Sequence, residues 1–352
     1  MNVLFVGPVP PIQGGISQHS ARLVGAMQSV GHNVETVTWR SQYPRWIYKG
    51  EQPNKQARFA TGVRPILKWY SPSSWWLARR MANTVDLVVA QWVHPFHALA
   101  VRSFLGGARG ASVVVVHNAQ PHESFPFADP ATRFALRRAG RFVAHSQTEA
   151  DVLAMILRRA DVAVTPLPPN LSIRPQQPAQ RPPWRLLFTG YVRSYKGPDV
   201  AIEAMRYLPE QFPAVLTIAG SFWHQYEDLR ALVDRHDLSE RVVMLDRYLS
   251  DREMADMIAD HHMVLAPYRS ASQSGVIPLS LAAGRPVIAS RVGGLAEQVP
   301  DGAGALVEPD HPKALAAAVL AVAERYDAAC AAAAGGAPSW EVAVDTIVGE
   351  AP

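Results

Sequence analysis

Short runs of consecutive apolar residues alternate along the chain with longer stretches in which apolar residues recur at helical spacing. The runs lie at residues 2–6, 86–92, 111–116, 141–144, 186–189, 216–219, 242–245 and 263–266, and residues 33–38 predict a further strand. Continuous runs rich in Val, Ile and Leu are typical of parallel strands buried on both faces. The intervening stretches predict helices, and Ser146 followed by Glu149 predicts a capping box at one helix start. The alternation therefore predicts an α/β chain.

Length and proline content indicate where this chain divides. A chain of 352 residues exceeds the size at which one hydrophobic core usually stops growing, so we expect two domains. Residues 166–184 contain seven prolines, a composition that gives a stiff, extended linker. We therefore expect a first domain at residues 1–170, a linker at 171–184 and a second domain at 185–337.

A loop with two cations follows the first apolar run of the second half. That run ends at Gly190, and Arg193 and Lys196 follow before an amphipathic stretch at 201–208. This order predicts a strand, a loop and a helix. Loops at the carboxyl ends of parallel strands bind ligands in open α/β sheets, and two cations beside a helix N-terminus suit a diphosphate. The alternative is that both cations are solvated loop charges.

Three motifs carry a resemblance to a known family. They are the Gly14-Gly15 turn, the Gly190-x-x-Arg193-x-x-Lys196-Gly197 loop, and the run from Gly284-x-Pro286-Val287 to Gly293-Gly294-x-x-Glu297. In this order and spacing, over nearly the whole chain, they resemble the retaining, nucleotide-sugar-dependent glycosyltransferases of family GT4. That family has the GT-B fold, in which two Rossmann-like α/β domains face each other across a donor cleft. The first turn lacks the G-x-G-x-x-G spacing of dinucleotide-binding proteins, which argues against an NAD enzyme.

The resemblance implies transfer of a sugar from a nucleoside diphosphate sugar to a hydroxyl acceptor, with retention of configuration and without a cofactor. Arg193 and Lys196 are expected to neutralise the departing diphosphate, and His117 to lie near the transferred sugar and the acceptor. The helix at 338–352 is expected to cross back onto the first domain. Candidate donor-binding residues, taken from the motifs and from positions after predicted strands, are Gly14, Gly15, Gly190, Arg247, Tyr248, Gln273, Ser274, Gly275, Val276 and Glu297.

The chain departs from the family at one motif. GT4 enzymes usually carry two glutamates, one that positions the hydroxyls of the donor sugar and one that holds the nucleotide ribose. Counting back from Gly284, Ala271 and Leu279 or residues adjacent to them occupy these places, and neither carries a carboxylate. The identity of the donor therefore stays open. A nucleotide-sugar epimerase or hydrolase and a catalytically degenerate, cationic surface-binding protein are the alternatives.

Charge is distributed unevenly between the two halves. Residues 1–184 contain 20 Lys and Arg against 8 Asp and Glu, a net charge of +12, whereas the rest contain 14 against 22, a net charge of −8. A cationic half indicates that it faces a polyanionic surface. Nucleic acid and anionic lipid are two such surfaces. An anionic membrane is the expected partner, since no recognisable nucleic-acid motif is present, and a nucleic-acid binder is the third alternative function. The single cysteine, Cys330, and the lack of a signal peptide or a spanning apolar run predict a cytoplasmic protein, peripheral on the inner face of the membrane.

The segment at 39–81 mixes aromatic rings with cations. Its members include Trp46, Tyr48, Lys49, Trp69, Tyr70, Trp75, Trp76, Arg79 and Arg80. On short helices at 57–67 and 72–81, such residues would insert rings at a lipid interface while the cations meet anionic headgroups. The alternative is that the tryptophans lie in the core and the cations are solvated. The resemblance implies that a lipid-linked or glycan acceptor docks on this domain.

Several histidines lie near predicted strand ends. His94 and His97 follow one strand, and His117 and His122 follow the next. No carboxylate-rich ligand set accompanies either pair, so no metal is expected. Apart from His117, these are expected to be hydrogen-bonded structural groups. Gln18 and His19, one turn into the first helix, are further candidates to face the donor cleft; the alternative is that both are simply exposed.

Overall fold

The computed structural model describes residues 1–12, 14–44, 58–120, 127–159, 161–173, 175 and 181–349. The chain forms two compact units: Met1–Pro166 with Ser339–Pro352 is the first, and Leu167–Pro338 is the second. This boundary falls before the predicted end of the first domain at residue 170. The difference arises because Leu171, placed by the sequence at the start of the linker, is buried in a core cluster of the second unit. Residues 174 and 176–180 of the predicted linker lie outside the described residues.

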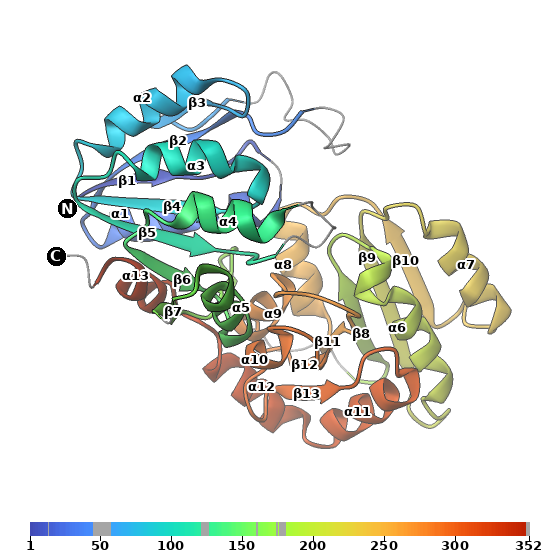
Figure 1. Cartoon of the computed structure of the whole chain (residues 1–352). Coiled ribbons are helices and arrows are strands. Elements are labelled where there is room, and N and C mark those ends of the chain that lie inside the picture. Colours follow the sequence, from blue (N-terminus) through green and yellow to red (C-terminus); the bar gives the residue numbers. More distant parts are fainter. Residues whose placement is uncertain are drawn as a thin grey trace. The chain divides into compact units, whose positions relative to one another are not determined.

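A parallel sheet forms the centre of the first unit (Figure 1). Its strands are β1 (Asn2–Val6), β2 (Asn33–Ser41), β3 (Val63–Lys68), β4 (Leu87–Trp92), β5 (Ala111–Val116), β6 (Arg141–Ala144) and β7 (Val162–Val164). Their order across the sheet is β3-β2-β1-β4-β5-β6-β7, and all neighbours pair in parallel. The first strand, β1, thus has β2 and β3 on one side and β4 to β7 on the other, and the two sides wind in opposite directions, which is the Rossmann-like arrangement.

Both faces of this sheet are covered by helices. They are α1 (Gly15–Ser29), α2 (Pro72–Ala82), η1 (Pro95–His97), α3 (Ala98–Leu105), α4 (Ala128–Leu136), α5 (Gln147–Leu157) and α13 (Trp340–Val348). Side chains alternate between two cores along β1: Leu4 packs with residues of α2 to α5, and Phe5 packs with residues of α1 and α13. The alternation is the period of two that a strand imposes, and it explains why the strands read as unbroken apolar runs.

The second unit repeats this arrangement (Figure 1). Its strands are β8 (Trp184–Thr189), β9 (Ala214–Gly220), β10 (Val242–Asp246), β11 (Met263–Ala266), β12 (Val287–Ser290) and β13 (Gly304–Val307), in the parallel order β10-β9-β8-β11-β12-β13. Its helices are η2 (Ser194–Lys196), α6 (Pro198–Ala204), η3 (Met205–Tyr207), α7 (Tyr226–Arg235), α8 (Asp251–Asp260), α9 (Val276–Ala282), α10 (Leu295–Gln298), α11 (Pro312–Glu324) and α12 (Tyr326–Gly335). The predicted parallel α/β architecture is confirmed.

The predicted helix at 57–67 is wrong, because Val63–Lys68 forms the edge strand β3. Gly62, with φ of +85°, turns the chain into the strand, and the β-branched Val63 and Ile66 favour extended backbone. Pro65 lacks an N–H donor, which an edge strand tolerates. The second helix of this segment, predicted at 72–81, is observed as α2.

The helix α13 lies far along the chain but belongs to the first unit. Val344, Ile347 and Val348 are buried against α1 and the adjacent face of the sheet. Arg141 of β6 donates to the Thr346 carbonyl over 2.7 Å. These contacts place residues 340–348 on the first unit, where the resemblance puts them. Among the described residues, no helix has the length and hydropathy to cross a bilayer.

We expect Ile347→Ala to destabilise the first unit by about 2–4 kcal/mol, because it leaves a cavity in a core where Ile347 is fully buried. Val342→Ala on the same helix is the matched control, since Val342 is 55% exposed and surface changes alter stability by about 0.5 kcal/mol or less. Native-state hydrogen exchange at the β1 amides measures the effect. Equal protection in the two variants would show that α13 does not stabilise this unit.

Candidate active site

The loop after the central strand β8 carries the two predicted cations. Gly190 ends the strand with φ of +104°, η2 ends at Lys196, and Gly197 adopts the left-handed conformation before α6. Because β8 pairs with β9 on one side and β11 on the other, this loop lies at the point where the winding of the sheet reverses. Ligands of open α/β sheets bind at that point.

Glycines at two positions allow loops to approach closely here. A Cβ atom on Gly220, which ends β9, would lie 1.7 Å from the carbonyl oxygen of Gly190. A Cβ atom on Gly197 would lie 2.2 Å from the carbonyl oxygen of Pro267, after β11. Both positions also have positive φ, which glycine adopts without strain. The loops that follow β8, β9 and β11 therefore converge at one place.

Lys196 turns back over the start of its own loop. Its Nζ atom lies 3.5 Å from the position of a Cβ atom on Gly190 and 5.3 Å from the centre of the buried Tyr268 ring. The guanidinium of Arg193 lies 4.3 Å from the centre of the Trp223 ring. Burial lowers the pKa of the Lys196 ammonium, and the nearby Arg193 charge lowers it further. Within the described ranges, neither cation forms an ion pair with a carboxylate.

Arg269, which the sequence analysis did not single out, holds this cation loop in place. Its guanidinium donates to both carboxylate oxygens of Asp199, over 2.9 and 2.6 Å, and to the Ser194 carbonyl over 2.6 Å. A further bond of 2.5 Å joins it to Asp310. The hydrogen bond to Asp199 is the main reason that the pKa of Arg269 is raised. Bidentate pairing of this kind fixes geometry as well as charge.

Ser274 and Val276, two of the predicted donor-binding residues, bond within the protein. The buried Ser274 hydroxyl lies 3.3 Å from both the Tyr268 hydroxyl and the Val276 amide. The Ser274 backbone is clamped by Gln298, which accepts from its N–H over 2.7 Å and donates to its carbonyl over 3.0 Å. Burial raises the pKa of Tyr268 to about 12. This segment is therefore held rigidly from within.

The neighbouring candidates differ in their surroundings. Gly275 is exposed, with nothing within 4 Å of a Cβ atom placed on it. Glu297 is exposed on α10, whereas the adjacent Gln298 makes the clamp. Glu297 is the residue that the sequence motif predicts. The hydrophobic pattern gives no sign that the neighbouring Gln298 makes the contact instead. Gln273 is half-buried in the same segment.

The structure shows the surroundings of Leu279 and Ala271, the two positions at which the family usually has glutamates. Leu279 is 4% exposed and lies in a core cluster, so that side of α9 is apolar. Ala271 is half-buried, and its carbonyl oxygen lies 1.8 Å from the position of a Cβ atom on Gly293. A carboxylate at Leu279 would therefore have to displace core packing.

Arg247 and Tyr248 follow β10 and are exposed. Arg247 donates to Glu253 over 2.6 Å, so its charge is already paired. Glu253 also completes a capping box with Ser250. Arg247 thus has a carboxylate partner, whereas Arg193 and Lys196 have none among the described residues.

An open pocket of about 390 Å³ lies beside α6 and α7 in the second unit. Asp199, Glu203 and Asp228 are among its lining residues, and Arg269 is turned to Asp199 there. Three carboxylates against the two arginines of the lining, Arg235 and Arg269, leave it net negative, so this pocket does not suit the diphosphate donor that the sequence predicts.

In the first unit, Gly14 and Gly15 lead into α1. Gly14 has φ of +122°, and an added Cβ at either glycine would meet nothing within 4 Å. His117 lies just beyond β5, and its Nε2 atom is 2.5 Å from Gln91 Oε1 at the end of β4. Both of these loops lie at the carboxyl edge of the first sheet.

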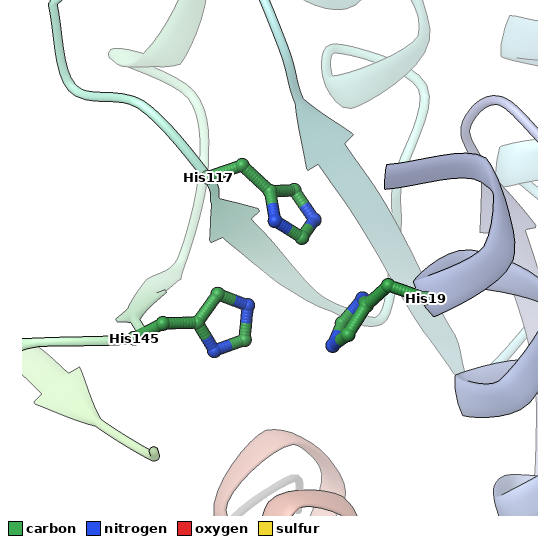
Figure 2. A group of neighbouring side chains, drawn as sticks. All are labelled: His19, His117 and His145. Atoms are coloured by element: carbon green, nitrogen blue, oxygen red, sulfur yellow. The ribbon is translucent and has the colours of Figure 1, made fainter. Parts of the chain in front are cut away.

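His117 meets two other histidines, as Figure 2 shows. His19 comes from α1 and His145 lies just after β6, and the three ring centres are 4.9–5.0 Å apart. We call them the three-histidine cluster. Burial lowers the pKa of His19 and of His117 well below 6.5, and the neighbouring imidazoles lower it further. Burial likewise lowers the pKa of His145 to about 4.

The histidines after β4, His94 and His97, form hydrogen bonds within the first unit. The His94 imidazole accepts from the Phe96 amide over 3.1 Å. His97 bonds to the Gln42 carbonyl over 3.0 Å, and burial lowers its pKa to about 4. His122 lies outside the described residues.

The predicted capping box at Ser146 forms only in part. The Ser146 side chain accepts from the Glu149 amide over 3.2 Å, as expected. The Glu149 carboxylate instead accepts from the Ala119 amide over 2.6 Å. Burial raises the pKa of Glu149, and the bond to Ala119 opposes that shift. Glu149 therefore supports the chain just beyond His117 rather than its own helix start.

We expect Arg269→Gln to release the cation loop without unfolding the second unit. The variant loses the bidentate bond to Asp199 and the bond to the Ser194 carbonyl, so hydrogen exchange at the Lys196 and Gly197 amides should accelerate about tenfold or more. Arg291→Gln is the control, because its ion pair with Glu308 is exposed and should not affect the loop. Unchanged exchange in Arg269→Gln would show that the loop is held by other contacts.

Both units are similar to known protein families. Residues 14–168 match the family model described as glycosyl transferase 4-like domain, and residues 183–325 match that of glycosyl transferases group 1. The chain is similar to the D-inositol 3-phosphate glycosyltransferase of Paenarthrobacter aurescens (31% identity, 49% of this chain, 46% of the relative) and that of Geodermatophilus obscurus (27%, 80% and 64%). The matched part thus spans about half to two thirds of these curated relatives.

Solved structures share the fold. Sucrose-phosphate synthase from Thermosynechococcus elongatus superimposes with a TM-score of 0.75 at 17% identity, covering 98% of this chain and 96% of that one. Anabaena HepE in complex with UDP gives 0.69 at 16% identity, covering 99% and 95%. Since the two family matches fall in turn on the first and second units, and GT-B structures share their architecture, the chain belongs to the group 1 glycosyltransferases of family GT4, as its three glycine motifs predicted.

Proposed function

We propose that the protein transfers a sugar from a nucleoside diphosphate sugar to a hydroxyl acceptor, with retention of configuration. One observation carries the proposal: Arg193 and Lys196 lie three residues apart in the loop that follows β8, at the carboxyl edge of the second sheet, and neither has a carboxylate partner in the described part of the chain. Like charges repel, so an anion bound there would be strongly favoured. A diphosphate meets that requirement.

The surrounding loop supports a diphosphate in particular. Lys196 lies over Gly190, beside Val276 at the start of α9, and the exposed Gly275 leaves open space next to it. The hydrogen bonds of Arg269 fix the loop in advance, so the two cations need to move little when negative charge develops on the diphosphate. HepE, which has the same fold, has been crystallised with UDP and with UDP-glucose. A uridine diphosphate sugar is therefore the first donor to test.

The proposed chemistry follows from this placement. As the glycosidic bond of the donor breaks, negative charge develops on the diphosphate, and Arg193 and Lys196 stabilise it without a metal on the phosphates. The acceptor hydroxyl attacks from the face that the phosphate leaves, and the departing phosphate takes its proton. Ala271 and Leu279 supply no carboxylate nucleophile, which disfavours the two-carboxylate route of glycosidases.

For the first unit we propose acceptor binding, with His117 as the candidate residue. Gln91 and the loop that Glu149 supports hold His117 in place. The curated relatives are named for D-inositol 3-phosphate, so this phosphorylated polyol heads the acceptor panel. Lipid-linked glycan precursors are the second class to test.

Peripheral contact with an anionic membrane belongs to the same proposal. Trp76 is 55% exposed on α2, Leu77 is exposed beside it, and Arg80 lies 4.9 Å from the centre of the Trp76 ring. Trp75, by contrast, donates to the Lys68 carbonyl and packs against the core. One tryptophan of the pair thus supports the fold, and the other is available to a lipid interface. Trp46, Tyr48 and Lys49 lie outside the described residues.

We expect Arg193→Gln and Lys196→Gln each to lower kcat for sugar transfer by about 10²–10³-fold, because each removes a charge from the developing diphosphate. Arg252→Gln, on the exposed face of α8, is the control and should retain full activity. Transfer is followed with a panel of nucleoside diphosphate sugars, and NMR of the product gives its anomeric configuration.

Several results would contradict the proposal. If a variant that carries both Arg193→Gln and Lys196→Gln formed product at the wild-type rate, the two cations would have no part in the mechanism. An inverted anomer would overturn retention. Free sugar or a changed donor sugar, formed at full rate without any acceptor, would identify a hydrolase or an epimerase instead.

We expect Trp76→Ala combined with Arg80→Gln to weaken binding to vesicles of phosphatidylglycerol and phosphatidylcholine by about tenfold, because an inserted ring and a headgroup contact are lost. The matched control changes Tyr207 to Ala and Arg206 to Gln, another exposed aromatic ring beside an arginine, in the second unit. Sedimentation with the vesicles measures binding. Equal loss in both double variants would mean that α2 is not the membrane-facing surface.

A further inference from the structure

Three separate segments of the first unit bring imidazoles to one buried point (Figure 2). His19, His117 and His145 are each 3% exposed. One ring nitrogen from each lies within 4.8 Å of one from each of the others. The Trp340 ring of α13, 5.0 Å from His19, adds an apolar wall. A cluster of this kind requires an explanation, because buried polar groups normally have partners.

Hydrogen bonds to two of the rings determine which nitrogen carries the lone pair. His145 Nδ1 lies 3.1 Å from the Thr165 carbonyl, which can only accept, so Nδ1 carries the proton and Nε2 the lone pair. His117 Nε2 lies 2.5 Å from Gln91 Oε1 and donates to it, which leaves the lone pair on Nδ1. A carbonyl that holds the far nitrogen of a histidine is the usual outer support of a metal ligand.

Two of the three histidines, His19 and His145, have ring nitrogens that lack the partners a purely structural role would provide. His145 Nε2 and both nitrogens of His19 are buried and make no hydrogen bond to any residue that the structure describes. An imidazole left in this state loses about 1–3 kcal/mol for each unsatisfied group. The lone pair of His145 and the unpartnered nitrogens of His19 lie where a shared ligand would satisfy them.

We propose that His19, His117 and His145 form a binding site for a divalent transition metal of the zinc class. Three neutral imidazoles without thiolate or carboxylate suit Zn²⁺, Ni²⁺ or Cu²⁺ rather than Mg²⁺ or Ca²⁺. Zinc bonds of about 2.0–2.1 Å set tetrahedral nitrogens roughly 3.3 Å apart, so the rings need to close inward by about 1.5 Å at most. The fourth position is open to water, as in sites with three protein ligands.

The bound metal would tie α1 to the ends of β5 and β6. Its charge is partly compensated because a zinc-bound water has a pKa of about 7 and can bind as hydroxide. No metal is expected from the sequence, because no carboxylate-rich ligand set accompanies His94 with His97 or His117 with His122. The folded chain groups different histidines, from positions 19, 117 and 145.

The test uses the full chain, freed of any affinity tag and dialysed against EDTA. One equivalent of Zn²⁺ or Co²⁺ is added, and metal content after gel filtration, the visible spectrum of the Co²⁺ form and the melting temperature are measured. We expect one metal per chain, the absorption of tetrahedral Co²⁺, and a higher melting temperature with Zn²⁺, since a ligand of the native state stabilises it. His19→Gln and His145→Gln should each weaken binding at least about 100-fold.

His97→Gln is the matched control, because His97 is equally buried in the same unit but lies outside the cluster. It should bind metal like the wild type. If a cluster variant fails to fold, X-ray absorption of the zinc-loaded wild-type protein still decides, by showing three imidazole ligands or fewer. Absence of metal at micromolar concentrations, or equal binding by cluster variants and wild type, would overturn the site. These readouts need no donor or acceptor, so they test the metal site separately from the proposed sugar transfer. A metal on His117 Nδ1, with Nε2 bonded to Gln91, would replace the direct acceptor contact proposed for that ring.

Discussion

Parallel pairing within each sheet is the constraint on which the positions of the candidate residues depend. Because neighbouring strands run in one direction, every loop that follows a strand emerges at the same edge. In the second unit that edge carries the cations after β8 and the rigid segment after β11. In the first unit it carries His117 and His145. The helices on both faces make this arrangement stable, since each strand buries apolar side chains in both directions.

Repulsion between Arg193 and Lys196 has to be overcome by the rest of the second unit. Close approach through Gly197 and the bonds from Arg269 to Asp199 and the Ser194 carbonyl supply the opposing free energy. The loop that carries both cations is therefore fixed before any ligand arrives. Functional sites commonly retain unfavourable local electrostatics in this way, because the strain is relieved when the ligand binds.

Apolar runs were sufficient to predict most strands, because a strand buried on both faces has no polar position to interrupt it. They failed at Val63–Lys68, an edge strand whose proline and charged residues resemble a loop or a helix. The short strands β7, β12 and β13 were not predicted either, because each has only three or four residues. Glycine motifs predicted the family and the cation loop. Arg269, Gln298 and the three-histidine cluster could not be predicted, since their roles depend on partners far away in the chain that only folding brings together.

The attachment of α13 to the first unit has a consequence for biosynthesis. Domains usually fold as they leave the ribosome, the N-terminal one first. Here the face of the first sheet that α1 covers lacks its second helix until residues 340–348 emerge, after the whole second unit has been made. During that interval the apolar surface that α13 will cover is exposed on the nascent chain and can aggregate. In a chain shortened by a dozen residues this surface would stay exposed.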